Sequence, residues 1–365
     1  MGKKVLYLVA DDRYFYTHRL PLASKAQDQG YEVTVASPSQ GSHLKIQHAG
    51  LNFYPIKFNR GGINPWREIK TLWAIYKLFH LLKPDIVHLV ALKPVLYGTF
   101  VGLFTRIPLI VSAISGLGVI FSQNHWLQKP VKIILKNLLC WKRVKVIVQN
   151  PDDAAALQSL SPDIQVNLIL GAGVNTSIFY PEPEPSGPIT IVHVSRLLWT
   201  KGINEFVSAA QILKQKGHNF RFLLVGEPDL ENANAVPKDV IQKWHQEKVI
   251  EWLGYCEDIS NLYQNCHIAV LASYYREGIP KSLLEAAACG KPIITCDMPG
   301  CRIIVQDGMN GYLIPPRNNQ ALADKILDLA LNSDRRLQFG GMSRTFVLES
   351  FNEDRICQQT LNLYA

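Results

Sequence analysis

The feature that most restricts the fold of this chain is an alternation of short apolar runs with helix-like segments. Each run is six or seven residues long, rich in β-branched residues and almost continuously apolar. Strands of this kind, separated by helices, are typical of a parallel sheet covered by helices on both faces. In the first half of the sequence the runs are residues 5–10, 31–37, 85–90, 108–114 and 144–149.

A Pro-rich stretch, YPEPEPSGP, interrupts the alternation, which then restarts. In the second half the runs are residues 189–195, 220–226, 249–254, 267–273, 291–297 and 311–316. We therefore predict two α/β domains, each a doubly wound Rossmann-like sheet, facing each other across a cleft. The predicted boundaries are 1–180 for the N-terminal domain, 181–188 for a linker, 189–345 for the C-terminal domain and 346–365 for a C-terminal helix that packs back on the first domain.

Composition excludes several functional classes. Between Lys93 and Arg106 the most apolar region has only twelve uninterrupted residues, whereas a membrane-spanning helix needs about twenty. Seven cysteines without a CxxC pair indicate neither a disulfide framework nor a zinc site, and they favour the reducing cytosol. The net charge of +8 indicates an anionic partner. Nucleic acid is not expected, because no signature of a nucleic-acid-binding motif is present.

Two carboxylates stand in the stretch SYYREGIPKSLLEAAACGKP. Proline is favoured in the first turn of a helix, so Pro280 places Glu277, Gly278 and Ile279 in the loop before that helix. Helix N-termini favour anions. Glu285 falls about one and a half turns into the helix among apolar neighbours, and a buried carboxylate needs hydrogen-bond donors. Those donors are either ligand hydroxyls or a neighbouring backbone group or arginine.

A second motif, SRLLWTKG, follows the first strand of the C-terminal domain. It places Arg196 and Lys201 beyond the carboxyl end of that strand. A guanidinium and an ammonium at this spacing can straddle a diphosphate and neutralise a departing one. Taken alone, the segment is more typical of a solvated basic loop.

In combination these motifs resemble the retaining glycosyltransferases of family 4, which have the two-domain GT-B fold. Segments 225–229, 252–273 and 290–316 add matching residues, so the resemblance covers essentially the whole chain. It implies that the motif residues bind a nucleotide-sugar donor. The implied roles are diphosphate binding and leaving-group stabilisation for Arg196 and Lys201, ribose binding for Glu285, sugar and distal-phosphate binding for Glu277, Gly278, Ile279 and Pro280, and base recognition by backbone around Gly226, Leu253 and Gly254.

The resemblance narrows further in the first domain. HRLPL, LKPVLYG and ISGLG resemble a bacterial subgroup that builds capsular, O-antigen or N-linked glycans on polyprenyl-diphosphate carriers, often with N-acetylhexosamines. Many family members place a histidine after the strand at 108–114, whereas this chain has Ser115 and Gly116 there. We expect the acceptor-side candidates to be His18, Arg19, Lys93, Ser115 and Gly116.

The resulting expectation is transfer of a sugar from a UDP-linked donor to a polyprenyl-diphosphate-linked saccharide. No D-x-D triplet occurs in the sequence, which fits an enzyme that uses cationic side chains and needs neither metal nor cofactor. The alternatives are a GDP-sugar-dependent mannosyl- or fucosyltransferase, a nucleotide-sugar 2-epimerase of the same architecture, and a non-catalytic subunit of a glycan-assembly complex.

An anionic lipid acceptor would also explain the charge. Residues 126–143 contain five basic residues and no acid. In a helix, Leu127, Val131, Ile134, Leu138 and Trp141 form an apolar stripe beside Lys129, Lys132, Lys136 and Arg143. Such a helix either lies on an anionic membrane or packs its apolar stripe on the sheet with a solvated basic face. The first alternative predicts a cytoplasmic protein bound to the inner face of the cell membrane.

Overall fold

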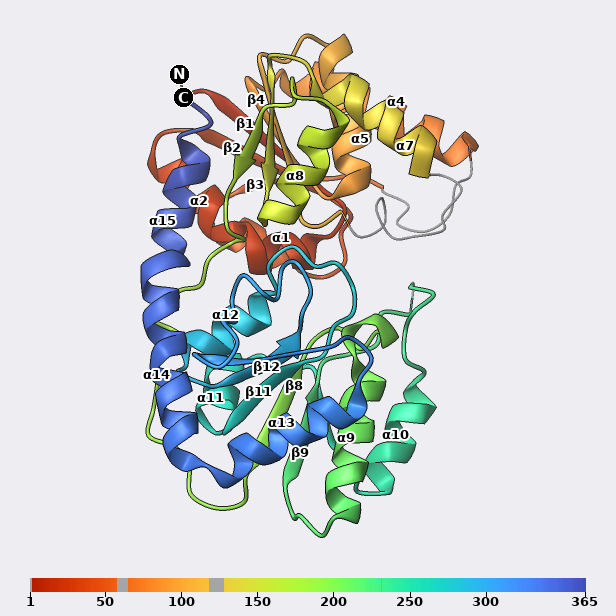
Figure 1. The fold of residues 1–365 in the computed structure, drawn as a ribbon. Helices are drawn as coiled ribbons and strands as arrows, with labels where there is room; N and C mark the ends of the chain where they lie inside the picture. The colour runs from red at the N-terminus through yellow and green to blue at the C-terminus, as the bar shows by residue number, and fades with distance from the viewer. Residues whose placement is uncertain (1, 58–64, 118–127, 231) are drawn as a thin grey trace. The chain divides into compact units, whose positions relative to one another are not determined.

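The computed structural model describes residues 2–57, 65–117, 128–230 and 232–365. The chain forms two compact units: Met1–Ala172 with Asp354–Ala365 make up the first, and Gly173–Glu353 the second. Each unit contains one parallel sheet with helices packed on it (Figure 1). The predicted α/β class with two doubly wound domains is therefore confirmed.

The first sheet consists of seven parallel strands. They are β1 (Lys4–Val9), β2 (Glu32–Ser37), β3 (Asn52–Pro55), β4 (Ile86–Val90), β5 (Leu109–Ile114), β6 (Val144–Val148) and β7 (Val166–Leu168). Their order is β3-β2-β1-β4-β5-β6-β7, so the order reverses at β1, which pairs with both β2 and β4. The short edge strands β3 and β7 were not among the predicted runs.

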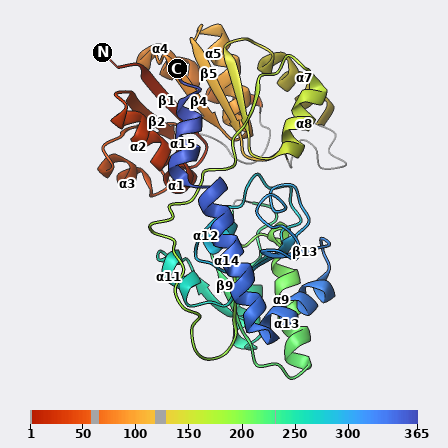
Figure 2. The same cartoon turned by 60° about the vertical axis from the view of Figure 1, so that its left-hand side comes forward.

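Helices cover both faces of this sheet (Figures 1 and 2). They are α1 (Asp12–His18), α2 (Leu20–Asp28), α3 (His43–His48), α4 (Pro65–Leu82), α5 (Leu92–Phe104), α7 (Gln128–Leu139), α8 (Pro151–Leu160) and α15 (Glu353–Leu361). Because side chains alternate along a strand, Leu6 and Leu8 of β1 share a core with α4, α5, α7 and α8. Val5, Tyr7 and Val9 share the opposite core with α1, α2, α3 and α15. Burial on both faces explains the continuous apolar runs.

The second sheet has six parallel strands, and each corresponds to a predicted run. They are β8 (Thr190–Val194), β9 (Arg221–Val225), β10 (Glu251–Gly254), β11 (Ile268–Leu271), β12 (Ile293–Cys296) and β13 (Gly311–Ile314), in the order β10-β9-β8-β11-β12-β13. The helical segments are η1 (Trp199–Lys201), α9 (Ile203–Gln215), α10 (Lys238–Gln246), α11 (Ile259–Gln264), α12 (Lys281–Ala288), α13 (Asn319–Leu331) and α14 (Ser333–Ser350).

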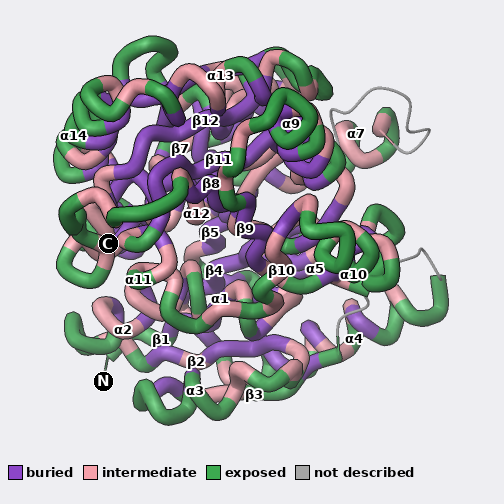
Figure 3. The backbone as a smooth tube through the Cα atoms, turned by 90° about the horizontal axis from the view of Figure 1, so that it is seen from below, coloured by how far each residue is buried: buried purple, intermediate pink, exposed green. Residues whose placement is uncertain are grey.

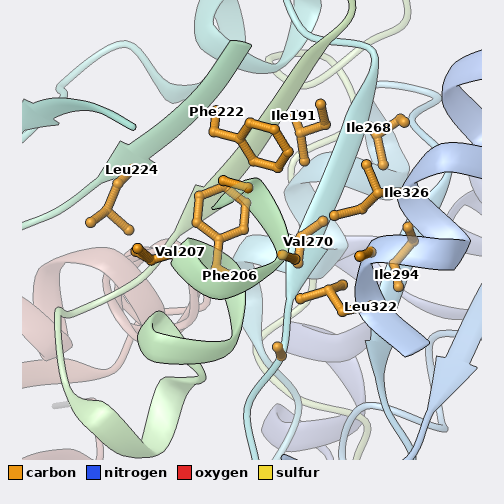
Figure 4. Packing of buried hydrophobic residues seen from close by; sticks show 14 of the residues in the cluster. Ile191, Phe206, Val207, Phe222, Leu224, Ile268, Val270, Ile294, Leu322 and Ile326 are labelled. Atoms are coloured by element: carbon orange, nitrogen blue, oxygen red, sulfur yellow. The ribbon is translucent and has the colours of Figure 1, made fainter. Parts of the chain in front are cut away.

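The core of the second unit lies between this sheet and helices α9 and α13. Phe206 of α9 packs edge-to-face on Phe222 of β9, with ring centroids 5.5 Å apart. Ile326 of α13 belongs to the same cluster as Ile268 and Ile294 (Figure 4). Most strand residues of both sheets are buried, whereas the outer turns of the helices are exposed (Figure 3). This packing holds the strand ends, and the loops that follow them, in fixed positions.

The chain crosses between the units at positions other than the predicted linker. It leaves the first unit after Ala172 and returns at Asp354, so residues 181–188 belong to the second unit. Glu184 accepts hydrogen bonds from Arg336 Nε and Nη2 at 2.6 and 2.8 Å, which ties the Pro-rich stretch to α14. The predicted C-terminal helix is also interrupted, because α14 ends at Ser350 and a separate α15 follows. Within the described ranges, no helix combines the length and apolar character needed to cross a membrane.

Candidate active site

The predicted donor residues gather at the carboxyl edge of the second sheet. Arg196 and Lys201 follow β8, and Glu277 follows β11, which pairs with β8. The strand order reverses at β8, and in open α/β sheets ligands bind at such a switch point beyond the carboxyl ends of the strands. Topology therefore brings both cations and the carboxylate to the position where a ligand is expected.

Lys201 and Glu277 form an ion pair across this switch point. The Nζ of Lys201 contacts Oε1 of Glu277, and each side chain is only 14% exposed. Ser273 donates a hydrogen bond to the same carboxylate oxygen at 2.9 Å. The sequence did not predict this pair, because the two residues were assigned to different parts of the donor. The arrangement holds an ammonium and a carboxylate in fixed positions at one point of the sheet edge.

Arg196 makes a more exposed ion pair. Its Nη1 donates to Oδ2 of Asp229 at 2.9 Å, and the arginine side chain is 59% exposed. Exposed pairs contribute only about 0–1 kcal/mol. The guanidinium can therefore exchange Asp229 for a more highly charged ligand at little cost.

Backbone groups at the ends of β9 and β10 are also close together. Gly226 donates to the carbonyl of Gly254 at 2.7 Å and accepts from Trp252 Nε1 at 2.9 Å. Gly226 has φ of +128°, and a Cβ there would lie 1.9 Å from the Ser195 carbonyl oxygen. Only glycine fits this close approach. The adjacent Leu253 is 47% exposed, so an apolar side chain is accessible beside these backbone groups.

Helices α1, α9 and α12 begin differently. The N-cap residues of α9 and α12, Gly202 and Pro280, provide no side-chain hydrogen bond to the helix start. The N-terminus of α1 is different, because Asp11 accepts hydrogen bonds from the backbone N–H groups of Arg13 and Tyr14. A carboxylate thus occupies the corresponding anion position in the first unit. The start of α9 lacks such a carboxylate, which favours a bound anion there.

Glu285 lies in α12, where Pro280 and Lys281 start the helix as the sequence predicted. Burial raises the pKa of its carboxyl to about 7, although the Lys281 ammonium one turn earlier lowers it. Among the described residues, no group donates a hydrogen bond to this carboxylate. Glu285 is therefore a largely enclosed acceptor with unused hydrogen-bonding capacity.

The loop that carries Glu277 is in backbone contact with the loop after β12. A Cβ on Gly300 would lie 1.5 Å from the carbonyl oxygen of Gly278 and 2.9 Å from that of Glu277. No side chain other than hydrogen fits between these loops. Gly300 therefore sets the position of the peptide groups that precede α12, including Ile279, which is 8% exposed.

Two further features restrict the chemistry at this edge. Burial, with the nearby Lys201 ammonium, lowers the pKa of His193 to about 3, so its imidazole is neutral at physiological pH. Where the structure is described, no three His, Cys, Asp or Glu side chains cluster as a metal site would require. Arg196 and Lys201 are the cations that the sequence predicted at this edge, and both lie there.

The acceptor-side candidates lie in the first unit and differ in environment. His18 stacks on Tyr14, with centroids 4.2 Å apart. Lys93, at the start of α5, is paired with Glu68 at 3.0 Å. Ser115 and Gly116 follow β5, the neighbour of the strand that precedes Lys93. Arg19 is the most unusual candidate.

Arg19 is 3% exposed, and its Nε and Nη2 atoms have no hydrogen-bond partner among the described residues. Burial of His88 holds the pKa of its imidazole well below the usual range, and the nearby positive charge of Arg19 lowers that pKa further. A buried guanidinium with unsatisfied donors is costly. The first unit thus contains a buried cation with unused capacity to bind an anion.

Comparison with known proteins assigns the family. Residues 4–150 match the model described as "Glycosyl transferase 4-like", and residues 175–345 match "Glycosyl transferases group 1". The chain belongs to glycosyltransferase family 4. Its two sheets correspond to the GT-B fold of this family. Among solved structures, an Anabaena protein titled "Alr3699/HepE in complex with UDP and glucose" superposes with a TM-score of 0.81 at 18% identity over 99% of both chains.

Curated relatives of this family 4 protein include enzymes of bacterial glycan assembly. An N,N'-diacetylbacillosaminyl-diphospho-undecaprenol alpha-1,3-N-acetylgalactosaminyltransferase of Campylobacter jejuni is 29% identical over 96% of this chain and 95% of that protein. The putative glycosyltransferase EpsD of Bacillus subtilis is 26% identical over 100% of this chain and 97% of its own length. The protein is therefore a glycosyltransferase related to enzymes that assemble lipid-linked glycans.

Three residues of the candidate site were not singled out by sequence reasoning. Asp229 and Ser273 bind the predicted Arg196 and Glu277, and Gly300 supports the Glu277 loop. Asp229 and Gly300 stand three residues beyond the ends of the predicted runs 220–226 and 291–297, and Ser273 is the last residue of the predicted run 267–273. Position relative to strand ends was therefore the available signal.

Proposed function

We propose that this protein is a retaining glycosyltransferase that moves an N-acetylhexosamine from a UDP-linked donor to a polyprenyl-diphosphate-linked saccharide. The observation that carries the proposal is the Lys201–Glu277 pair at the switch point, just before the start of α12. The donor class is supported by the related structure that contains UDP and glucose. The acceptor class is supported by the Campylobacter relative, whose name specifies an undecaprenol-diphosphate acceptor and N-acetylgalactosamine transfer.

In this proposal the donor diphosphate lies near Arg196 and Lys201. Arg196 exchanges Asp229 for phosphate, and Lys201 stabilises the charge of the leaving UDP. Glu285 accepts hydrogen bonds from the ribose hydroxyls, which complete the unused capacity of its carboxylate. Backbone around Gly226, Leu253 and Gly254 recognises the base. The proposed donor site thus requires neither a metal nor a cofactor.

The proposed reaction retains the configuration of the transferred sugar. The bond between sugar C1 and the diphosphate oxygen breaks as the acceptor hydroxyl forms a new bond to C1 on the same face. The hydroxyl proton passes to the departing phosphate. Glu277, with Gly278, Ile279 and Pro280, positions the sugar. Because Glu277 is held by Lys201 and Ser273, we assign it this positioning role and not that of a covalent nucleophile.

On the acceptor side we propose Arg19 as the main anion-binding residue. Its buried, unsatisfied donors would gain partners from an acceptor diphosphate. Lys93 is a weaker candidate, because Glu68 already neutralises it. His18, Ser115 and Gly116 remain candidates for contacts to acceptor hydroxyls.

The direct test is incubation of the purified protein with a panel of UDP- and GDP-sugars and lipid-diphosphate-linked acceptors, followed by mass spectrometry. We expect a mass increase of one N-acetylhexosamine on the acceptor with a UDP donor, undiminished by EDTA. Transfer from GDP-mannose or GDP-fucose only would replace the proposed donor. Conversion of a UDP-sugar without acceptor would indicate a 2-epimerase. UDP binding without turnover on any acceptor would indicate a non-catalytic subunit.

A further inference from the structure

We propose that the outer surface of helices α4, α5 and α7 is a docking face for an anionic lipid bilayer. The inference rests on the proposed function in one respect, namely that the acceptor is embedded in a membrane. The docking face is defined by exposed apolar side chains interspersed with lysine and arginine. Its principal apolar members are Trp66, Ile69, Trp73, Phe104, Ile133 and Trp141.

Helix α4 presents two different faces. Trp66, Ile69 and Trp73 are 76%, 56% and 57% exposed, and their spacing puts them on one side of the helix. Ile75 and Phe79 are buried in the core on the other side. The helix therefore needs only one apolar face for folding but carries a second, aromatic face outward.

The neighbouring helices continue this apolar surface. Helix α5 packs against both α4 and α7 (Figures 1 and 2), and its last residue, Phe104, is 74% exposed. In α7, Leu135 and Leu139 are buried, whereas Ile133 is 62% exposed. Trp141, beyond the end of the helix, is 52% exposed. Exposed apolar side chains on helices that pack together are typical of an interaction surface.

The predicted stripe on α7 is divided between the core and the exposed surface. Leu127 lies outside the described residues, Val131 packs against the core, and Ile134 and Trp141 are exposed. Leu135 and Leu139, which are not in the stripe, are the fully buried residues of this helix. The two alternatives considered for residues 126–143 are therefore compatible, since α7 packs on the core with one side and leaves apolar groups outside.

Among the described residues, the helices that carry the exposed aromatics are rich in basic side chains. Exposed basic residues on or beside the three helices include Arg67, Lys70, Lys77, Lys129, Lys136 and Lys142. The acid that these helices contain is Glu68; its side chain is 13% exposed and binds Lys93 and the Tyr97 hydroxyl. Lys77 also lies over the ring of Trp73, 5.5 Å from its centroid.

Charge is separated between the two units. The second unit contains 17 Lys and Arg and 20 Asp and Glu, which gives it a net charge of −3. Because the whole chain has a net charge of +8, the first unit has a net charge of +11. The excess positive charge therefore belongs to the unit with the docking face and not to the unit with the proposed nucleotide site. Aromatic and basic residues together, without exposed acids, match the interfacial region of a negatively charged bilayer.

A second copy of this chain fits the face less well. In a two-fold dimer the same patch meets itself, so lysines would face lysines and repel each other. Protein interfaces are also depleted in lysine. A bilayer surface containing anionic lipid supplies the opposite charge and an apolar layer for the aromatic rings.

The test uses flotation of the whole protein with vesicles of phosphatidylcholine, with and without phosphatidylglycerol. We expect wild type to bind only the phosphatidylglycerol vesicles and to be released by high salt. The triple variant Lys70→Glu, Lys129→Glu, Lys136→Glu should bind about a hundredfold more weakly, because each cation near an anionic surface contributes about fivefold. The variant Trp73→Ala, Phe104→Ala, Ile133→Ala should also bind more weakly.

Matched controls are placed on the second unit. Lys216→Glu, Lys243→Glu, Lys248→Glu changes the net charge equally, and Leu331→Ala, Leu337→Ala, Leu348→Ala removes equally exposed apolar groups. Both controls should bind vesicles as wild type does. The proposal is overturned if wild type ignores phosphatidylglycerol or if the docking variants bind as tightly as the controls. It is also overturned if sedimentation shows a dimer that the docking variants dissociate while vesicle binding is unchanged.

Activity measurements separate this inference from the proposed function. On a water-soluble acceptor with a short prenyl chain, the docking variants should keep the wild-type rate. On the same saccharide in vesicles they should lose most of it. Vesicle binding without transfer to any acceptor would leave the docking face intact and refute the glycosyltransferase proposal. Transfer in vesicles that is equal for all variants would refute the docking face and leave the proposed function intact.

Discussion

At the scale of single residues, the central feature is the largely buried pair of Lys201 and Glu277. Removal of one partner leaves an uncompensated charge in a poorly solvated place, whereas removal of both does not. Structural and catalytic contributions of the pair can therefore be separated by a double-mutant cycle.

We predict that Lys201→Met lowers both stability and kcat, the latter by about 10²–10³-fold, because a preorganised cation for the leaving phosphate is lost. In the double variant Lys201→Met, Glu277→Gln, thermal stability should recover substantially while kcat stays low. Thermal unfolding and steady-state kinetics measure the two effects.

The matched control for this cycle is Arg221→Met, which breaks an exposed pair with Glu251 on the same sheet. It should change neither kcat nor UDP affinity. If Glu277→Gln alone left turnover and donor affinity intact, the role proposed for this carboxylate would be wrong.

Glu285 gives a pH prediction. Burial raises the pKa of its carboxyl to about 7, and the ribose hydroxyls need the ionised form as acceptor. Below pH 7 the protein must first lose a proton to bind, so UDP affinity should fall about tenfold between pH 8 and pH 6. Titration calorimetry across this range measures it. The Glu285→Gln variant should bind UDP more weakly than wild type at pH 8, and its affinity should depend little on pH. If the UDP affinity of wild type did not change between pH 6 and pH 8, the assignment would be contradicted.

The same shift predicts how stability depends on pH. The folded-state pKa of Glu285 lies above its unfolded value of 4.5, so the native state holds the proton more tightly. Between about pH 4.5 and pH 7 this carboxyl therefore makes stability fall as pH rises. Glu285→Gln removes that cost, and its stability relative to wild type should increase from pH 5 to pH 8 by on the order of 2 kcal/mol. Chemical denaturation at both pH values is the measurement.

At the scale of helices and strands, the sequence predicts the buried elements well. Strands such as β1 and β8 are covered on both faces, so their apolar runs are unambiguous. Edge strands β3 and β7 are short and partly exposed, which leaves no periodic pattern to find. The sequence also left the inward face of α7 open, because Ile134 and Leu135 are equally apolar and only packing decides which of them is buried.

The predicted site shows the same limit. Strand ends place Arg196, Lys201 and Glu277 at one sheet edge, which the sequence predicts. The partner of each charge depends on loop geometry: Lys201 and Glu277 are 76 positions apart, and Arg196 meets Asp229 across 33. Sequence patterns contain periodicity and local signals, but not the direction in which a loop turns.

Gly300 allows a prediction at this scale. Gly300→Ala places a methyl group against the Gly278 carbonyl, so the loop that holds Glu277 must move. We expect destabilisation by about 1–3 kcal/mol together with weaker donor binding, measured by thermal unfolding and by UDP titration. The control is Gly341→Ala in α14, where a Cβ meets nothing within 4 Å; this variant should be neutral or slightly stabilised. Unchanged UDP affinity in Gly300→Ala would show that the contact between the loops does not position the site.

At the scale of the whole molecule, the first unit depends on the end of the chain. Ile356, Leu361 and Tyr364 are buried in its core. The Tyr364 hydroxyl lies 2.9 Å from that of Tyr7 and 2.6 Å from Nδ1 of His88. The C-terminal segment is therefore a structural part of a domain that begins at the N-terminus.

We predict that removal of residues 354–365 unfolds the first unit and leaves the second unit able to bind UDP. Limited proteolysis should then degrade residues 1–172 selectively. Tyr364→Phe is a milder change, because the ring stays and only the hydroxyl is lost. Tyr7 and His88 then each lose a hydrogen bond, which should lower the free energy of unfolding by about 1–3 kcal/mol. A truncated protein in which residues 1–172 resist protease would contradict the prediction.

The two crossings between the units lie side by side: Val174 donates to the Phe351 carbonyl at 3.0 Å, and Glu353 donates to that of Val174 at 3.2 Å. In topological terms the second unit is an insertion in the first, and its entrance and exit are adjacent. Excision of residues 173–353, with a short Gly-Ser bridge in their place, should therefore yield a small protein that folds independently, binds anionic vesicles through α4, α5 and α7, and has no affinity for UDP.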